Sequence, residues 1–131
     1  MLEAIKLGAV GERSLVVEEQ HTAARWGSGS LLVFSTPEMI ALMECAAVAA
    51  VDSVLPPGHH TVGIHVDVSH TAATPVGHKV TAHAELIEID GRKLGFRVRA
   101  YDDAGTIGEG LHYRFIIEEA RFMQRARSRG G

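Results

Sequence analysis

Residues 38 to 52 restrict the folds open to this chain more than any other segment. Between Glu38 and Asp52 every residue is apolar or small except Glu44. The segment is preceded by Ser-Thr-Pro and followed by Pro-Pro-Gly, which predicts a helix over residues 37–54 with Ser35 as its N-cap, in a capping box with Glu38. A helix that is apolar on all sides must be surrounded by protein. In a domain of this size, only a sheet that curls around the helix can provide that.

The residues after the helix have the pattern of such a sheet. Alternating side chains predict strands at 62–70, 79–89, 93–101 and 106–117, with a bulge near Ile87 and tight turns at 90–91 and 102–105. We expect a first strand at 14–21, a flexible loop at 22–30 and a short C-terminal helix with a basic tail. In the last strand, we expect these residues to share the inward face: Ile107, Leu111, Tyr113, Phe115 and Ile117.

This order predicts an α+β fold in which an antiparallel sheet wraps around one long central helix. Its edge strands and single-helix core lead us to expect a homodimer or a higher assembly. The chain has 131 residues, 46% of them hydrophobic, which is enough for one domain spanning 1–131.

Charge and composition exclude several functional classes. A formal net charge of −3 gives no reason to expect a nucleic-acid partner. The longest apolar run, residues 39–51, is interrupted by Glu44 and is too short for a membrane span. The N-terminus lacks the pattern of a secretory signal, and a single cysteine cannot form an intrachain disulfide. We therefore expect a cytoplasmic protein with no membrane partner.

Glu44 and Thr36 are candidates for chemistry on the predicted helix. An unpaired carboxylate in an apolar helix costs several kcal/mol or has a raised pKa, so Glu44 is either a general base or nucleophile, or a structural carboxylate paired with an arginine or backbone amide. Thr36 lies at the helix N-terminus, where it is either a cap or a group beside N–H donors that can hold an oxyanion. Eight residues separate the two, about 12 Å of helical rise, so a group from the sheet or from a second subunit must join them.

His70 is the candidate for that group. In strand 62–70 it shares a phase with Val62, Ile64, Val66 and Val68, and not with the alternate residues Gly63, His65, Asp67 and Ser69. That phase points His70 at the helix, either as an acid or base near neutral pH or as a core histidine bonded to a backbone carbonyl. No pair of histidines has the spacing and the flanking carboxylate of a metal site, so we expect no metal.

Three segments together resemble a known family. FSTPEMIALMECA, GIHVDVSHTAATP and AELIEIDGRKLGFRVRAYD are similar to fluoroacetyl-CoA thioesterase-like proteins of the hot-dog fold, from about residue 34 to 125. The most specific part is S-H-T-A-A-T-P combined with a threonine eight residues before the helical glutamate. The resemblance implies the helix-in-sheet dimer and the hydrolysis of an acyl-CoA thioester, with coenzyme A as part of the substrate and no other cofactor.

The resemblance also assigns residues. The active-site threonine, glutamate and histidine of the family match Thr36, Glu44 and His70, in a site at the dimer interface. A family glycine matches Gly63 and an arginine late in the last strand matches Arg114, both as substrate-binding residues.

One region departs from the family, and two other functions stay open. The phenylalanine lid before the threonine is RWGSGSLLVF here, so we expect a short or branched acyl group other than fluoroacetyl. The alternatives are a non-catalytic acyl-CoA-binding module and an enoyl-CoA hydratase; the Asp-His pair of the latter has no counterpart, since Asp52 lies too near the helix end.

Overall fold

The computed structural model describes residues 2–130. The elements, in chain order, are β1 (Val10–Val16), a 3-10 turn (Glu19–His21), α1 (Ala23–Trp26), α2 (Thr36–Val51), a second 3-10 turn (Asp52–Val54), β2 (His59–His70), β3 (Lys79–Asp90), β4 (Lys93–Asp102), β5 (Gly105–Glu118) and α3 (Glu119–Arg129).

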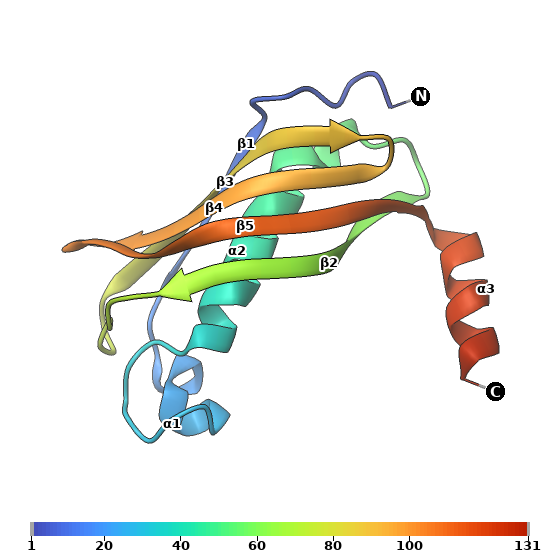
Figure 1. Ribbon diagram of the computed structural model, residues 1–131. Coiled ribbons are helices and arrows are strands. Elements are labelled where there is room, and N and C mark those ends of the chain that lie inside the picture. The colour runs from blue at the N-terminus through green and yellow to red at the C-terminus, as the bar shows by residue number, and fades with distance from the viewer. Residues whose placement is uncertain (1, 131) are drawn as a thin grey trace.

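One antiparallel sheet forms the body of the protein, and α2 crosses one of its faces (Figure 1). The strand order is β1-β3-β4-β5-β2, so β2 follows α2 in the chain but lies at the far edge, beside β5. Strands β3, β4 and β5 form the predicted meander, with the tight turns at the expected positions and Gly91 at a φ of 61°. The α+β prediction with one long central helix is confirmed.

The helix α2 begins as predicted, but only half of the capping box forms. Ser35 Oγ accepts a hydrogen bond from the Glu38 N–H at 3.2 Å, and Pro37 occupies the first turn. The Glu38 carboxylate does not reach back to the cap. It accepts a hydrogen bond from Trp26 Nε1 at 2.9 Å instead, which ties the segment around α1, residues 22–32 (the α1 segment), to the start of α2.

The prediction that α2 is surrounded on all sides is wrong for a single copy of the chain. The buried side of α2, with Met39, Met43 and Ala47, packs chiefly against β1 and β3. The opposite side is open: Ala41 and Cys45 are exposed, and Glu44 is half-buried. Because β2 lies at the edge beyond β5, the sheet does not curl far enough to cover this open side.

Two bulges change which residues of β2 and β5 face α2. The β2–β5 register shifts between Gly63 and His65, and the β4–β5 register shifts opposite Ala100 and Tyr101, at the level of Ile107. A bulge inserts one residue and so reverses the alternation beyond it.

The consequences differ for the two strands. In β2, Val66, Val68 and His70 face inward as predicted, but the prediction is wrong for Val62, which pairs with Phe115 on the outer face. In β5 the predicted inward set is wrong beyond Ile107. The buried residues are His112, Arg114 and Ile116, and the residues expected inside are half-buried or exposed: Leu111, Tyr113, Phe115 and Ile117.

The N-terminal part differs from the prediction, while the C-terminal helix agrees with it. The first strand is Val10–Val16, not 14–21, and residues 19–21 form a 3-10 turn. The expected flexible loop contains the one-turn helix α1, capped by Thr22 and ended by Gly27. The basic C-terminal helix forms as α3, and none of its residues is buried. Within residues 2–130 no helix has the length and apolarity needed to span a membrane.

Candidate functional site

Thr36 and His70 meet at one end of the sheet. Thr36 is the first residue of α2 and His70 is the last residue of β2, and Thr36 Oγ1 lies 2.8 Å from His70 Nδ1 in a hydrogen bond. Pairing of His70 with Gly108 on the inner face of the sheet directs the imidazole toward α2. The structure therefore brings together two of the three residues expected to act in catalysis.

The second ring nitrogen of His70 has no hydrogen-bond partner. Nε2 is buried, and no group of residues 2–130 bonds to it. Burial lowers the pKa of His70 from its ordinary 6.5, and a backbone contact with Ala72 opposes this effect. A neutral imidazole can accept the Thr36 hydroxyl proton at Nδ1, which places the N–H on Nε2. The pair has the geometry of a nucleophile and its base, with one N–H left for another molecule.

A hollow of about 330 Å³ opens beside this pair, between the α1 segment and the residues that follow β2. Its wall includes Thr36, His70, Phe34 and Ala72. The start of α2 adds a backbone donor: Pro37 has no N–H, and Ser35 Oγ occupies the Glu38 N–H, so the Thr36 N–H remains available to a ligand. Together with the positive end of the helix dipole, this donor suits a carbonyl that gains negative charge.

Glu44 belongs to a different cluster, nearer the middle of β2. Its Oε2 accepts a hydrogen bond from Arg114 Nη1 at 3.1 Å. Arg114 also donates to Thr61, from Nε to Oγ1 at 2.8 Å and from Nη2 to the backbone oxygen at 2.9 Å. The expectation that Glu44 lies in fully apolar surroundings is wrong, since its side chain is 42% exposed, whereas the alternative that the carboxylate pairs with an arginine is confirmed. Burial is the main cause that lowers the pKa of Arg114.

His112 completes this cluster and was not singled out by sequence reasoning. Its Nδ1 lies 2.8 Å from the His65 backbone oxygen, so Nδ1 carries the proton and donates it. Nε2 is then an acceptor, and Arg114 Nη1 lies 3.1 Å away from it. Burial lowers the pKa of His112 first of all, and the Arg114 charge adds to the effect. His112 is thus a neutral acceptor that holds the guanidinium toward Glu44.

Gly63 makes room for the cluster. The bulge in β2 places Gly63 opposite Arg114 on the inner face, although strict alternation predicts the outer face. A Cβ at this position would lie 2.6 Å from Glu44 Oε2 and 3.3 Å from Arg114 Nη1. Only glycine leaves these two charged side chains in contact, so Gly63 acts here through the space that it leaves open.

Within one copy of the chain the two clusters are separate. No hydrogen bond or ion pair links Glu44 to Thr36 or His70 among residues 2–130. Glu44 instead borders a second hollow, of about 410 Å³, together with Ala41, Cys45 and Arg114. Three or more His, Cys, Asp or Glu side chains do not gather anywhere in the same range in a way that could hold a metal ion.

The chain matches known proteins over most of its length. The family model for fluoroacetyl-CoA-specific thioesterases matches residues 17–120, which include both clusters. This chain belongs to that family. Its sequence is 43% identical over 97 residues to the fluoroacetyl-CoA thioesterase of Streptantibioticus cattleyicolor, covering 74% of this chain and 70% of the relative. The family resemblance predicted from the sequence is confirmed.

Solved structures of the thioesterase family have the same fold. The structure of fluoroacetyl-CoA thioesterase FlK superposes with a TM-score of 0.88 at 35% identity, over 95% of this chain and 96% of that one. A thioesterase superfamily member from Thermus thermophilus has a TM-score of 0.86 at 26% identity, over 95% of each chain. A hot-dog-like protein from Thermanaerovibrio acidaminovorans, at 23% identity and a TM-score of 0.89, shares the fold over 98% of this chain and 96% of its own. The hot-dog fold is therefore confirmed.

Complexes of FlK also indicate the ligand class of the family. One contains a threonine-to-serine variant with acetyl-CoA, and another contains a phenylalanine variant with fluoroacetate and CoA. At the level of the family, thioester hydrolysis, which the sequence resemblance implied, is confirmed.

Proposed function

We propose that this chain hydrolyses the thioester of a short-chain acyl-CoA to the free acid and CoA. The observation that carries the proposal is the hydrogen bond between Thr36 Oγ1 and His70 Nδ1 at the N-terminus of α2, beside a hollow. A hydroxyl bonded to a neutral imidazole, next to an available backbone N–H, is suited to acyl transfer. The membership of the thioesterase family supports the same reaction class.

The geometry suggests a two-step reaction. The thioester carbonyl oxygen accepts a hydrogen bond from the Thr36 N–H while Thr36 Oγ1 attacks the carbonyl carbon, and His70 Nδ1 takes the hydroxyl proton. The C–S bond breaks, the thiolate takes the proton from His70, and the acyl group stays on Thr36 as an ester. Water then attacks the ester carbonyl while a base takes its proton; the bond between the acyl carbon and Thr36 Oγ1 breaks, and the proton passes from the base to Thr36 Oγ1, which frees the acid and the Thr36 hydroxyl.

Glu44 is the base that we assign to the water. The Arg114 guanidinium holds it in place, and Oε1, which has no partner among residues 2–130, is free to accept a proton from water. Within one copy the helical rise between Thr36 and Glu44 is about 12 Å, too far for both to reach one carbonyl. A second copy is needed to complete the site.

The free edge of β2 is the natural contact for that second copy. We consider antiparallel pairing of two β2 strands about a two-fold axis through their centre. This pairing would place His59 of one copy beside the C-terminal end of β2 in the other copy, and Gly63 level with the partner's residue 66. The Glu44–Arg114 cluster of one copy would then lie near the Thr36–His70 pair of the other. The half-exposed Val66 and the open side of α2 would be covered by the same contact.

The α1 segment is the region that we expect to select the acyl group. It carries Trp26, held by Glu38, and Leu31 and Leu32, whose side chains are 68% and 61% exposed. These residues stand where the family resemblance places a phenylalanine lid, so we propose a short or branched acyl group as the substrate. The proposed reaction uses no cofactor beyond the CoA of the substrate, and the single exposed Cys45 suits a cytoplasmic location.

Steady-state hydrolysis of a panel of short acyl-CoAs, followed by release of the free thiol, tests the proposal. We expect wild-type turnover, and a loss of kcat of about 10²–10⁴-fold in His70→Ala. Thr36→Ala should lose a similar amount, and the double variant little more than either one, because the two residues act as a unit. Binding of CoA esters without thiol release would instead identify an acyl-CoA-binding module.

A further inference from the structure

A groove lined by arginines lies at the opposite end of the sheet from Thr36 and His70. Helix α3 and the end of β5 border a small groove of about 120 Å³, below the tight turn between β3 and β4. Its wall is made of arginines and aromatic or apolar side chains, with one carboxylate: Arg92, Arg121, Arg125, Phe115, Phe122, Ile116, Ile117 and Glu118.

The arginines of this groove are free to bind an anion. No ion pair or side-chain hydrogen bond to another part of residues 2–130 involves Arg92, Arg121 or Arg125. The Glu118 carboxylate is occupied at the start of α3, where it accepts hydrogen bonds from the N–H groups of Ala120 and Arg121. Three unpaired guanidinium groups in a chain of net charge −3 form a local attraction for phosphate, which arginine binds in a bidentate manner.

Two aromatic rings beside the arginines suit the other part of a nucleotide. Phe115 on β5 and Phe122 on α3 are 39% and 36% exposed, and both border the groove. Exposed aromatic faces next to cationic groups are typical of surfaces on which a base stacks while its phosphates are neutralised. The groove is too small to enclose a nucleotide, so the phosphate would lie in it and the base against its rim.

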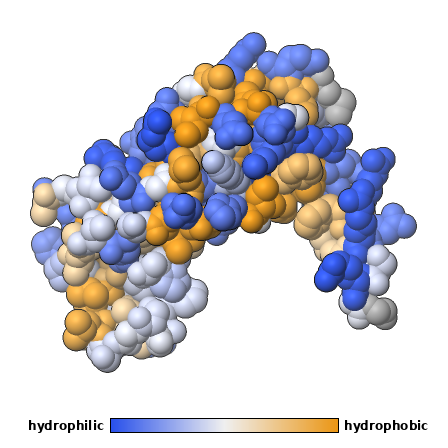
Figure 2. Space-filling model, in the orientation of Figure 1, coloured by the Kyte–Doolittle hydropathy of each residue, from blue (hydrophilic) through white to orange (hydrophobic). Residues whose placement is uncertain are grey.

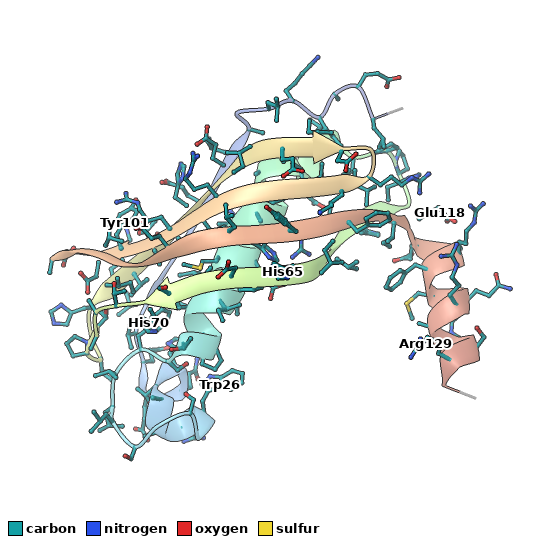
Figure 3. The ribbon with its side chains drawn as sticks, viewed as in Figure 1. Trp26, His65, His70, Tyr101, Glu118 and Arg129 are labelled. Atoms are coloured by element: carbon teal, nitrogen blue, oxygen red, sulfur yellow. The ribbon has the colours of Figure 1, made fainter. Side chains whose placement is uncertain are left out.

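The groove lies too far from His70 of its own copy to serve it. The base of α3 is tied to the beginning of β2, since the Glu119 N–H donates to the Gly58 oxygen at 2.9 Å and the His60 ring lies 3.5 Å from the Glu119 carboxylate. From there to His70 the twelve residues of β2 extend about 36 Å. Figure 3 shows this separation, with His70 at one end of the sheet and Glu118 at the other.

A second copy shortens this distance. In the antiparallel β2 pairing described above, the start of β2 in one copy lies beside the end of β2 in the other, and α3 follows the start. Figures 1 and 2 show that the α1 segment and α3 project from the same side of the sheet at opposite ends, with an open hollow between them. A two-fold related copy seated in this hollow would bring α3 of each copy next to the α1 segment of the other.

We propose that the groove of Arg92, Arg121 and Arg125 binds the phosphates of the CoA thioester whose acyl group is held by Thr36 and His70 of the second copy. This inference rests on the proposed function. It adds that CoA recognition is separate in the chain from the reacting groups and is supplied in trans by α3. Since none of the residues of α3 is buried, the helix would also gain its support from the same contact.

Substrates with and without the nucleotide test the groove. In Arg121→Ala/Arg125→Ala, KM for a short acyl-CoA should rise by about tenfold or more with kcat retained, since charged hydrogen bonds to phosphate are lost. KM for the same acyl group on pantetheine, which lacks the nucleotide, should stay at the wild-type value. An equal change for both substrates, or no change for either, would overturn the inference. A wild type inactive on both substrates would refute the proposed function itself.

A matched variant and a competing anion sharpen this comparison. Arg127→Ala/Arg129→Ala removes the same charge from the same helix outside the groove, and it should leave KM for the acyl-CoA near the wild-type value. If it raised KM as much, only the net charge of α3 would matter. Inorganic phosphate at constant ionic strength should compete far more weakly than free CoA, and equal competition would indicate a general anion site.

A mixed dimer tests the trans arrangement. One copy carries His70→Ala, and the other carries Arg121→Ala/Arg125→Ala, with different affinity tags so that only the mixed species is purified. The one functional His70 then belongs to the copy with the altered groove. If the groove acts in trans, this site uses the intact groove of its partner, and KM for acyl-CoA equals that of the wild type. A raised KM would show that the groove acts on its own copy and would overturn this part of the inference.

Discussion

The Thr36–His70 pair differs from a three-residue catalytic relay in what supports the histidine. Nδ1 is bonded to the threonine and Nε2 to no group in residues 2–130, so no carboxylate of the same copy orients the ring. The ring is instead held by its place at the end of β2 and by burial. Its protonation state therefore depends mainly on desolvation, which favours the neutral form.

The pH dependence of hydrolysis should report this effect. Only neutral His70 can accept the Thr36 proton, so kcat/KM should rise as the pH increases and reach a plateau. Because burial lowers the pKa of His70 from 6.5, the midpoint of the rise should lie below 6.5. A kcat/KM profile on one neutral acyl-CoA measures it. A midpoint above 6.5 would show that a different group or environment controls the reaction.

Gly63→Ala should disrupt the cluster of Glu44 and Arg114. The added Cβ would lie 2.6 Å from Glu44 Oε2 and would push the carboxylate away from Arg114. We expect kcat/KM to fall by about 10²-fold, the effect of a misplacement of about 1 Å, and the free energy of unfolding to fall by about 1–3 kcal/mol. The control is Gly130→Ala, whose Cβ would meet no atom closer than 3.4 Å. Unchanged activity in Gly63→Ala would remove Glu44 from the mechanism.

Some of the candidate residues could be predicted from local sequence patterns, and others could not. Thr36 and His70 were found from a helix start signal and a strand phase that hold in the structure. His112 was missed because its role depends on two tertiary contacts, to the His65 backbone and to Arg114, that leave no mark at short range in the sequence. The pairing of Glu44 with Arg114 joins residues 70 positions apart, and only the resemblance to the family indicated Arg114.

The predicted elements were more accurate than the predicted faces. Helix α2, the two tight turns and the β3 bulge lie where the sequence placed them. The predicted inward residues were wrong before the bulge in β2 and after the bulge in β5. A single inserted residue reverses the alternation, and neither bulge has a local signal in the sequence. Exposed apolar residues on the outer face of β5, such as Leu111 and Phe115, made the wrong phase look favourable.

The start of α2 links stability to the site, since Ser35 caps the helix whose first residue is Thr36. Ser35 is buried and its Oγ holds the Glu38 N–H. Ser35→Ala should lower the free energy of unfolding by about 1 kcal/mol, or the Tm by about 3–5 °C in thermal unfolding. Ser53→Ala, in the exposed turn after α2, is the matched control. A Tm equal to that of the wild type would contradict the role assigned to this cap.

At the scale of the whole molecule, one copy is open where a second copy would fit. The α1 segment and α3 project on either side of one hollow (Figure 2), β2 forms a free edge of the sheet, and one side of α2 is exposed. The proposed dimer explains why the two clusters of charged and polar residues are separate in a single copy. It also gives the lone helix α3 a neighbour.

The central claim is that one site uses Thr36 and His70 of one copy and Glu44 of the other. Mixed dimers of His70→Ala with Glu44→Ala test it most directly. Purified by two tags, each mixed dimer would carry both changes in one site and neither in the other. We predict about half of the wild-type kcat per dimer on a short acyl-CoA, while each pure variant is nearly inactive. A mixed dimer as inactive as the pure variants, or a protein that forms no dimer, would contradict the account.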